Sequence, residues 1–364
     1  METDSTAKKR KLDEVEGGSS SVIQVGGLTV REVHPHGFGC EVLDEDLDLK
    51  NMSAQQMQAF KDLMDKYDVI VVHGQDFPET VDQVNVITSL QPHNKELIAK
   101  GHGNNFDTTD HPLVRNSVWP SEKYVKVVHP GYAWHVDGIA WSETPIIWSC
   151  LHCIKAPKKG GETLFASSVV CYDLLDEAVK AKIDRLTAEY YDDYQVHGWK
   201  LDWFGTHRTD DVEETRQLHA AEGTERSKRH VTHPLVHVSK DGKKSIYTGN
   251  HTLYRFIGPD GPMTPAETHK LTGEILTPGV QPEHVFVMRW KPNDVAFFNN
   301  RRMLHSPTII ERFKNEERHI KQCFLPAIEK VKSVDEAERE GLIKPATTSG
   351  AQKTSDASTV AASG

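Results

Sequence analysis

The stretch Trp290-Lys291-Pro292-Asn293-Asp294-Val295-Ala296-Phe297-Phe298 sets a turn-forming Pro-Asn-Asp sequence in front of an apolar run. Pro, Asn and Asp favour turns, whereas β-branched and aromatic residues favour strands. Because the residues before Trp290 are also apolar, the stretch predicts a strand, a tight turn and a second strand. The polar residues Asn299, Asn300 and Arg301 follow at once, so side chains capable of chemistry would lie where the second strand ends.

Similar short apolar runs recur along the chain and indicate the fold class. We expect strands at Val69–His73, Ile146–Ile154, Thr163–Ala166, Ile246–Gly249, His284–Trp290, Val295–Phe298 and His319–Leu325. Many short strands separated by turns, with few helices, are typical of β-sandwiches and jelly rolls. The sequence therefore predicts a mainly β fold with flanking helices.

Two segments have the spacing of helices instead. Ser53 and Gln56 form the pattern of a capping box, and the apolar residues that follow recur at helical spacing up to Tyr67. Cys171–Glu189 shows the same spacing, so we expect a helix there as well.

Length and composition indicate how the chain is organised. It has 364 residues, of which 37% are hydrophobic. Residues 1–21 are polar and end in a Gly/Ser sequence, and residues 346–364 are rich in Ser, Thr, Ala and Gly. We expect both tails to be disordered. Since no linker or repeat divides the middle, the sequence predicts one domain over residues 22–345.

Net charge and cysteine content indicate which classes of partner and which cellular compartment to expect. A net charge of −10 argues against a nucleic-acid partner, because phosphate contacts need surplus Lys and Arg. No apolar run approaches the roughly 20 residues of a membrane span, so we expect no membrane partner. The five cysteines are scattered, which suits a reducing compartment, and we expect a cytoplasmic protein. The basic run Lys8–Lys11 resembles a nuclear-import signal, so a nuclear protein is the alternative.

The segment Tyr132-Ala133-Trp134-His135-Val136-Asp137-Gly138, far upstream of the opening stretch, pairs an imidazole with a carboxylate. Alternate residues of a strand point the same way, so His135 and Asp137 can reach one ion. His305 is the third ligand that we expect, entering from the side opposite the first pair. Two histidines and one carboxylate hold Fe(II) on one face and leave positions open. This set predicts an oxygen-using iron enzyme.

A His-x-Asp triplet is weak evidence by itself. The chain has 20 histidines, so about one such triplet is expected by chance. A surface strand end with an incidental histidine is therefore one alternative. A zinc hydrolase is another, because the same ligand set can hold zinc.

Cys150 and Cys153 form a Cys-x-x-Cys pattern, which in other proteins binds zinc or carries out redox reactions. Here the surrounding run from Ile146 to Leu151 is typical of a buried strand. Positions three apart on a strand face opposite sides. We therefore expect the two thiols to diverge and to belong to the core.

Thr163 and Arg318 suit the binding of a carboxylate. Pro157–Phe165 is a tight turn that leads into a strand with Thr163 at its start, and Arg318 lies on a predicted strand 13 residues after His305. A guanidinium offers a fixed fork for a carboxylate, and a hydroxyl adds a hydrogen bond. Both residues also have purely structural explanations, since Thr is common in strands and Arg318 lies in a charged run that a solvated surface would explain.

With these segments the chain resembles the TauD/TfdA family of Fe(II)- and 2-oxoglutarate-dependent dioxygenases, typified by taurine dioxygenase and 2,4-dichlorophenoxyacetate dioxygenase. The matching segments, in order, are His36–Val42, Trp134–Asp137, Glu143–Pro145, Gly160–Phe165, His233–Val236, Val295–Arg301, His305 and Arg318. No single segment is specific, but their number and order are. The resemblance runs from about His36 to about Pro326.

The resemblance implies a double-stranded β-helix (jelly-roll, cupin-like) core with iron held by His135, Asp137 and His305. It implies that 2-oxoglutarate is a co-substrate whose distal carboxylate meets Arg318 and Thr163. The implied reaction uses O2, converts 2-oxoglutarate to succinate and CO2, and hydroxylates a small organic molecule. The protein would position that molecule and exclude water, while iron and 2-oxoglutarate carry the oxidation.

Gln322 and His93 are the residues of the sequence that bear on the substrate. In the taurine enzymes an arginine four residues beyond the 2-oxoglutarate arginine binds the sulfonate, and here that position is Gln322. A carboxamide offers one donor group and one acceptor in place of a full charge. A purine such as xanthine therefore suits Gln322 better than a sulfonate does. An equally weighted alternative is that Gln322 only packs on the strand and that another residue binds a sulfonate or an aryloxy acid. His93 falls near a substrate-contacting histidine of the family, and the polar segment Gly103–Arg115 is a candidate lid.

Two other classes of function remain open. One is a catalytically inactive dioxygenase-fold binding protein, against which the intact ligand set argues. The other is a nuclear 2-oxoglutarate dioxygenase that acts on protein or nucleic acid. The acidic net charge argues against nucleic acid as the substrate. Family members often form dimers or tetramers, so a homo-oligomer is an option, although no segment indicates an interface.

Overall fold

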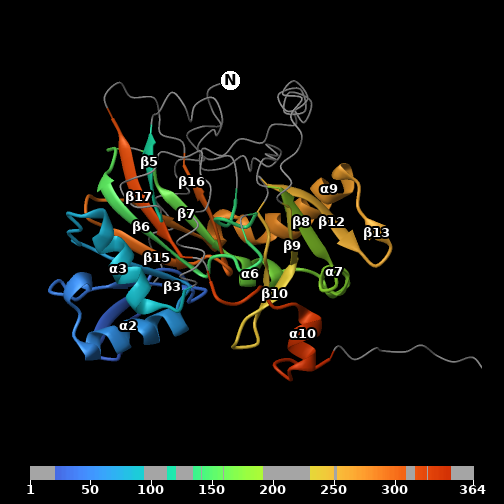
Figure 1. Ribbon diagram of the computed structural model, residues 1–364, viewed down its shortest axis with the longest axis horizontal. Helices are drawn as coiled ribbons and strands as arrows, with labels where there is room; N and C mark the ends of the chain where they lie inside the picture. The colour runs from blue at the N-terminus through green and yellow to red at the C-terminus, as the bar shows by residue number, and fades with distance from the viewer. Residues whose placement is uncertain are drawn as a thin grey trace, which may run out of the picture.

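The computed structural model describes residues 21–93, 113–119, 134–140, 142–158, 160–191, 230–249, 252–308, 316–325 and 327–345. The predicted N-terminal tail, apart from Ser21, and the predicted C-terminal tail lie outside these residues. Strands predominate, with a few helices around them (Figure 1). The prediction of a mainly β fold with flanking helices is confirmed. None of the helices in the described ranges is both long and apolar enough to cross a membrane.

An eight-stranded sheet forms the largest layer, in the order β1-β2-β3-β4-β15-β6-β17-β5. Its strands are β1 Val22–Val25, β2 Leu28–Glu32, β3 Gly39–Val42, β4 Val69–Val72, β5 Val114–Trp119, β6 Trp148–Lys155, β15 Val295–Asn299 and β17 Arg318–Phe324. β3 and β4 pair in parallel and the other neighbours pair antiparallel. β1, β2 and β3 are consecutive in the chain, whereas β15 and β17 pair with strands that lie far from them in sequence.

A three-stranded sheet packs against one face of the large sheet. Its order is β14-β7-β16, with β14 Val285–Met288, β7 Thr163–Ser167 and β16 Met303–Pro307. One core cluster joins the two sheets, with members from the large sheet (Val69, Val71, Leu151, Cys153, Ala296, Phe298, Ile320) and from the small one (Phe165, Met288, Met303). Burial of this shared apolar surface holds the two layers together.

The opening stretch is the crossing between these two layers. β14 ends at Met288 in the small sheet, and β15 begins at Val295 in the large one. Asn293, in the turn between them, has φ 68°, a left-handed conformation that Asn tolerates better than most residues. The prediction of strand, turn and strand is confirmed, and the turn connects two sheets instead of closing a hairpin.

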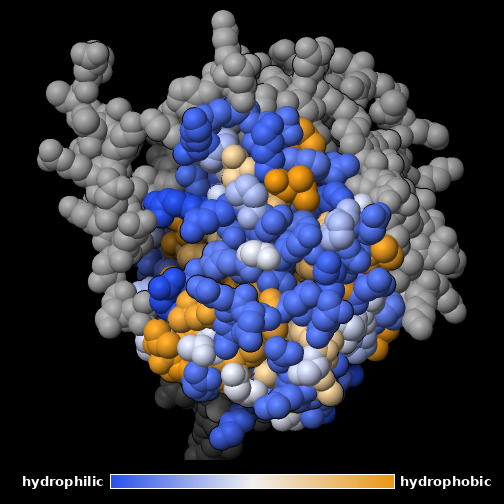
Figure 2. Space-filling model, turned by 90° about the vertical axis from the view of Figure 1, so that its left-hand side faces the viewer, coloured by the Kyte–Doolittle hydropathy of each residue, from blue (hydrophilic) through white to orange (hydrophobic). Residues whose placement is uncertain are grey.

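Two helices cover the other face of the large sheet. They are α2 Ala54–Lys66 and α3 Thr80–Leu90, seen in blue and cyan in Figure 1. The predicted capping box is present, because Ser53 and Gln56 bond each other's backbone N–H groups. Phe60 of α2 packs on Phe297 of β15 with ring centroids 5.2 Å apart. Seen from this side, the surface is mainly hydrophilic, with hydrophobic residues gathered at its lower left and a few elsewhere (Figure 2), as expected when most of the apolar helix faces turn inward.

A third region packs at the opposite end of the molecule from α2 and α3 (Figure 1). Its sheets are β13-β12-β8-β9 and β10-β11. The strands are β8 Thr187–Tyr191, β9 His230–Pro234, β10 Val236–Val238, β11 Lys244–Ile246, β12 Leu253–Gly258 and β13 Gly261–Pro262. Its helices are α6 Ser168–Asp173, α7 Glu177–Ile183, α9 Pro265–Leu276 and α10 Val334–Arg339, with the short 3-10 turn η3 Thr277–Val280. Two other 3-10 turns lie elsewhere: η2 Leu49–Asn51 packs on α3, and η4 Pro282–His284 leads into β14.

Two expectations were wrong in this region. Cys171–Glu189 is not one helix: α6 ends at Asp173, α7 begins at Glu177, and β8 occupies the last part. Asp176, as the residue before α7, starts a new helix and breaks the longer pattern. The strand predicted at Ile246–Gly249 lies earlier, since β11 ends at Ile246.

The two cysteines of β6 diverge as expected. Cys150 packs in the core between the large sheet and its helices, and Cys153 packs in the core between the two sheets. All five cysteines are free thiols and buried. Burial raises the pKa of Cys153 to about 12, so its reactive thiolate form is suppressed.

Candidate metal centre

His135 and His305 lie side by side rather than on opposite sides. Each donates its backbone N–H to the other's carbonyl, at 3.0 Å in both directions, which makes an isolated antiparallel bridge. Their ring centroids are 4.1 Å apart. The expectation that His305 enters opposite the first pair was wrong. The ligand-bearing segment extends the small sheet, because His305 belongs to β16.

Asp137 completes a compact set of three donor groups. Its Oδ1 lies 3.9 Å from His135 Nε2, and its Oδ2 lies 3.4 Å from His305 Nε2. One donor atom from each of the three residues lies within 4.8 Å of the others. Ligand atoms that each lie about 2 Å from one ion are roughly 3–4 Å apart. The observed spacings are close to that, so the three residues fit a single metal ion.

His305 is neutral and rigidly packed. Burial, together with the nearby His135, lowers the pKa of His305 to about 3, so at neutral pH its ring keeps a lone pair for a metal. The ring packs against Phe298 and Phe165, with centroids 4.7 and 6.3 Å away. Its Nδ1 is buried and has no hydrogen-bond partner in the part of the chain that the structure describes. Packing therefore fixes the orientation of this imidazole.

Asn300 holds the backbone at Asp137. Its side-chain oxygen accepts from the Asp137 N–H and its amide donates to the Asp137 carbonyl, both at 2.8 Å. Asn300 is completely buried and comes directly after β15. On the other side, a Cβ on Gly249 would lie 3.3 Å from Val136 N, a tight contact, so glycine favours the close approach of these segments. Asn300 was noted in the sequence, but its partner was not foreseen.

Among the described residues, Arg115, Ser149 and Gln322 contact the Asp137 carboxylate. Arg115 Nη2 lies 3.2 Å from Oδ1, Ser149 donates to Oδ2 at 3.4 Å, and Gln322 Nε2 also donates to Oδ2. Arg115 also donates from Nε to Gln322 Oε1. Arg115 is on β5, whereas the sequence analysis placed it at the end of a candidate lid. The rest of that segment, 103–112, lies outside the described residues.

Arg318 and Thr163 meet as predicted. Arg318 Nη2 donates to Thr163 Oγ1 at 3.1 Å, and its Nε donates to the Gly161 carbonyl at 2.8 Å. Gly161 has φ 75°, and a Cβ there would come within 3.1 Å of Arg318 Cδ. Glycine is therefore required beside this guanidinium. Trp290 Nε1 donates to the same threonine oxygen at 2.9 Å.

Arg318 is a buried cation without a carboxylate partner in the described part of the chain. Its side chain is only 5% exposed. Burial lowers the pKa of Arg318 to about 10, which leaves it charged at neutral pH. A buried charge is costly unless it is paired. The arrangement therefore suits an anionic ligand.

The strand register relates this cation to the metal ligands. His305 on β16 pairs directly with Phe165 on β7, and Thr163 lies two residues along β7. Side chains two apart on a strand share a face and are about 7 Å apart. Thr163 and the arginine bonded to it therefore lie close enough to the three donor groups for one small ligand to contact both.

Gln322 and His93 have different surroundings. Gln322 is buried against Asp137 and Arg115. His93 lies just after α3, and its Nδ1 is 3.3 Å from the Gln91 carbonyl. Contact of either residue with a substrate stays a prediction.

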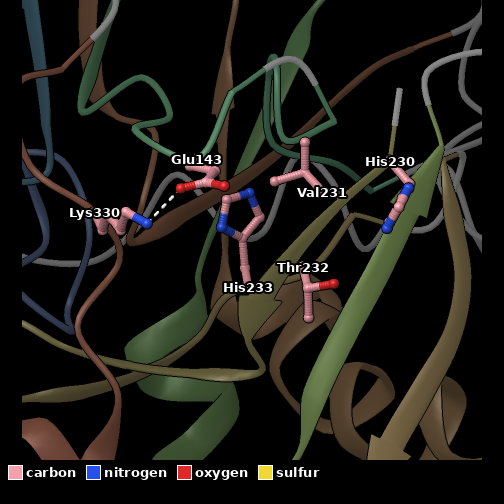
Figure 3. Close-up of a pocket in the computed structure, with 6 residues that line it drawn as sticks. All are labelled: Glu143, His230, Val231, Thr232, His233 and Lys330. Atoms are coloured by element: carbon pink, nitrogen blue, oxygen red, sulfur yellow. Dashed lines mark hydrogen bonds and ion pairs between the residues drawn. The ribbon is translucent and has the colours of Figure 1, made fainter. Parts of the chain in front are cut away.

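A separate polar pocket of about 250 Å³ lies at β9 (Figure 3). It is lined by Glu143, His230, Val231, Thr232, His233 and Lys330. In Figure 3 the His233 ring points toward the ion pair of Glu143 and Lys330. None of the three donor groups lines it. His233 Nε2 bonds the carbonyl of Ile139, two residues after Asp137, at 2.9 Å.

Known proteins resemble the chain over much of its length. It is 26% identical to an (S)-phenoxypropionate/alpha-ketoglutarate-dioxygenase of Sphingobium herbicidovorans, over 52% of this chain and 60% of the relative. It is 22% identical to the alpha-ketoglutarate-dependent xanthine dioxygenase of Schizosaccharomyces pombe, over 80% of this chain and 85% of the relative. The match to the first of these thus spans less than two thirds of that relative's length.

Solved structures show the same fold. A taurine dioxygenase from Burkholderia xenovorans matches with a TM-score of 0.63 and 18% identity, over 85% of this chain and 92% of that one. The structure of AAD-2 in complex with Mn(II) and N-oxalylglycine matches with a TM-score of 0.58 and 21% identity, over 84% and 100%. At these identities the likeness concerns the fold alone.

The family model described as "Taurine catabolism dioxygenase TauD, TfdA family" matches residues 29–324. This range includes the three donor groups, Thr163, Arg318 and both packed sheets apart from β1 and the first residue of β2. The resemblance expected from the sequence is thus confirmed, and the chain belongs to the TauD/TfdA family.

Proposed function

We propose that this protein is an Fe(II)- and 2-oxoglutarate-dependent dioxygenase that hydroxylates a small organic molecule and releases succinate and CO2. The observation that carries the proposal is the convergence of His135, Asp137 and His305 beside the buried Arg318–Thr163 pair. Family membership supports it. A zinc hydrolase would leave the buried arginine without a ligand to bind.

The core of this enzyme is, in our proposal, a double-stranded β-helix. The three-stranded sheet and the inner face of the large sheet supply its two walls. The shared apolar cluster between them and the fold of the solved relatives support this assignment. Such a core places the metal ligands and the buried arginine on facing, rigid strands.

His135, Asp137 and His305 would hold Fe(II) from one side and leave coordination positions for the co-substrate and O2. Iron and 2-oxoglutarate, when bound, supply the oxidising chemistry. The chain contributes the rest. The His135–His305 bridge sets the distance between the imidazoles, and Asn300 fixes the backbone that carries the carboxylate.

Arg318 and Thr163 would bind the distal carboxylate of 2-oxoglutarate. A guanidinium and a hydroxyl together offer a carboxylate charge-assisted hydrogen bonds. The span of about 7 Å between the Thr163 and His305 positions suits a five-carbon dicarboxylate whose other end reaches the metal. Trp290 would orient the threonine hydroxyl by donating to its oxygen.

The substrate class follows from the relatives and the site. Their names include (S)-phenoxypropionate, 2,4-dichlorophenoxyacetate, xanthine and sulfate esters. We propose a small sulfonate, aryloxy acid or purine such as xanthine, with Gln322 and His93 as the predicted substrate contacts. Succinate release measured across a panel of these compounds would test it, and highest turnover with taurine would refute the preference for a purine at Gln322.

Two other functions are kept as alternatives. A catalytically inactive binding protein would retain the fold without turnover. A nuclear dioxygenase acting on a macromolecule would use Lys8–Lys11 for import, a run that lies outside the described residues. We propose a cytoplasmic location. Loss of nuclear signal after removal of residues 1–21 would instead favour the nuclear alternative.

Replacing a proposed metal ligand tests the central assignment. We expect His135→Ala or Asp137→Ala to abolish succinate formation and tight Fe(II) binding, while circular dichroism stays that of a folded protein. His284→Ala is the matched control, because this histidine bonds His36 away from the metal centre. Full activity in either ligand variant would refute the iron assignment.

A further inference from the structure

Arg115 and Gln322 are a direct cross-strand pair. They lie opposite each other in the register of β5 and β17. Side chains at directly paired positions share a face of the sheet and are in contact range. Both therefore project from the same place on the large sheet, and Asp137 lies within reach of each.

The three side chains close a ring of hydrogen bonds. Arg115 Nε donates to Gln322 Oε1, Gln322 Nε2 donates to Asp137 Oδ2, and Arg115 Nη2 donates to Asp137 Oδ1. Each end of the glutamine amide and each oxygen of the carboxylate thus has a partner in the ring. A carboxamide carries a donor group and an acceptor, so Gln322 can accept from an arginine and donate to a carboxylate at once.

The carboxylate needs such partners to keep one orientation. Rotation about the last bond of an aspartate is broad and weakly restrained. The backbone clamp by Asn300 places the residue but does not set the plane of its carboxylate. Gln322 is only 2% exposed, so its two bonds are formed in a site with little competing water.

We propose that Gln322 and Arg115 are positioning residues, which fix the plane of the Asp137 carboxylate so that it is set for metal binding. This inference rests on the proposed function, because it takes Asp137 to be a metal ligand. Hydrogen-bond partners of metal ligands orient the ligands, and losing one costs about 10–100-fold in metal affinity or activity.

Gln322→Leu tests the proposal, because leucine fills similar space and removes both bonds. Co(II) added to the metal-free protein is the probe, with affinity measured by calorimetry and geometry by the visible spectrum of the bound ion. We expect the dissociation constant to rise about tenfold or more, with a changed spectrum. Gln83→Leu is the matched control, since Gln83 is equally buried but donates to the backbone of Cys150 and Lys321. It should lower stability and leave Co(II) affinity unchanged.

Arg115→Lys tests whether the ring acts as a unit. Lysine keeps the charge but cannot bond two partners with a planar fork. We expect it to weaken Co(II) binding, and we expect the double variant with Gln322→Leu to be little weaker than the more affected single one. Members of one hydrogen-bond network are not additive, whereas independent residues are. Fully additive effects would overturn the proposal.

The outcomes separate this inference from the proposed function. If the wild-type protein binds no Co(II), both fail. If the wild type and the Gln83 variant bind Co(II) and the Gln322 variant binds it equally well with the same spectrum, only the positioning role is overturned. A loss of affinity confined to Gln322→Leu and Arg115→Lys supports it.

Discussion

Asn300 and Arg318 show that the geometry and charge of this site also depend on residues that are not proposed metal ligands. Asn300 occupies a completely buried position and uses its amide only on the backbone of Asp137. Arg318 is a buried cation, and in the described part of the chain its side chain donates to two uncharged oxygens, those of Gly161 and Thr163. Such a cation is stabilised when a carboxylate binds beside it. The arginine should therefore govern affinity for the co-substrate.

Arg318→Lys should raise the KM for 2-oxoglutarate by about tenfold or more, since a hydrogen bond to a charged group is worth about 1.5–3 kcal/mol. Thr163→Val should raise it less, because only a hydroxyl is lost. Succinate formation at varied 2-oxoglutarate concentration measures both effects. Thr232→Val, at an exposed position of β9, serves as the control. An unchanged KM in Arg318→Lys would contradict the assignment of the carboxylate site.

The elements differ in how well the sequence predicts them. α2 was predicted because Ser53 and Gln56 signal its start directly. β6 and β15 were predicted because buried central strands are continuous apolar runs. The region of Cys171–Glu189 was mistaken for one helix because the apolar spacing continues across the break before Asp176, and only tertiary packing of β8 decides it.

The residues of the site likewise differ in how well the sequence predicts them. His135, Asp137 and His305, like Thr163 and Arg318, are recognisable from residue type and local context, and the structure brings each set together. Arg115 was missed because its role depends on the pairing of β5 with β17. No local pattern reveals that register. The placement of His305 beside His135 was missed for the same reason.

Ser53→Ala should destabilise the protein by about 1 kcal/mol, because an N-cap side chain satisfies a helix N–H that is otherwise unpaired. Urea unfolding monitored by circular dichroism gives this free energy. Ser53→Asp retains an acceptor at the same place and should stay near wild type. A loss in the aspartate variant as large as in the alanine variant would show that capping is not the cause.

At the scale of the whole molecule, one charged cluster ties the N-terminal strands to the central strand. His73, just after β4, bonds Asp294 through Nδ1 at 2.6 Å and Glu41 of β3 through Nε2 at 2.5 Å. The bond to Asp294, with that to Glu41, raises the pKa of His73 to about 9. The bond from His73 lowers the pKa of Glu41 to about 2.

These shifts set the sign of a pH dependence. The stabilisation from His73 is complete below about pH 6.5 and is lost as the pH rises toward 9, because the unfolded chain releases the proton first. The stabilisation from Glu41 is present above about pH 4.5 and is lost as the pH falls toward 2. The cluster should therefore stabilise the fold most between these limits.

Comparison of wild type with His73→Gln isolates this effect from other titrating groups. The difference in melting temperature should be largest near pH 5–6 and should shrink between pH 6.5 and 9. Thermal unfolding over that range measures it. A difference that does not vary with pH would contradict the cluster's role. Size-exclusion chromatography of the same samples would distinguish a monomer from a homo-oligomer, the option that the sequence leaves open.

The main-chain bridge between His135 and His305 has a consequence for how the protein acquires its iron. Reciprocal N–H to carbonyl bonds fix the spacing of the two imidazoles. The polypeptide therefore sets the shape of the metal site without needing the metal ion. In small zinc domains, by contrast, folding waits for the metal. This chain should thus fold first and bind its metal afterwards, in two independent steps. A cell short of iron would then accumulate folded, metal-free protein that can still bind iron.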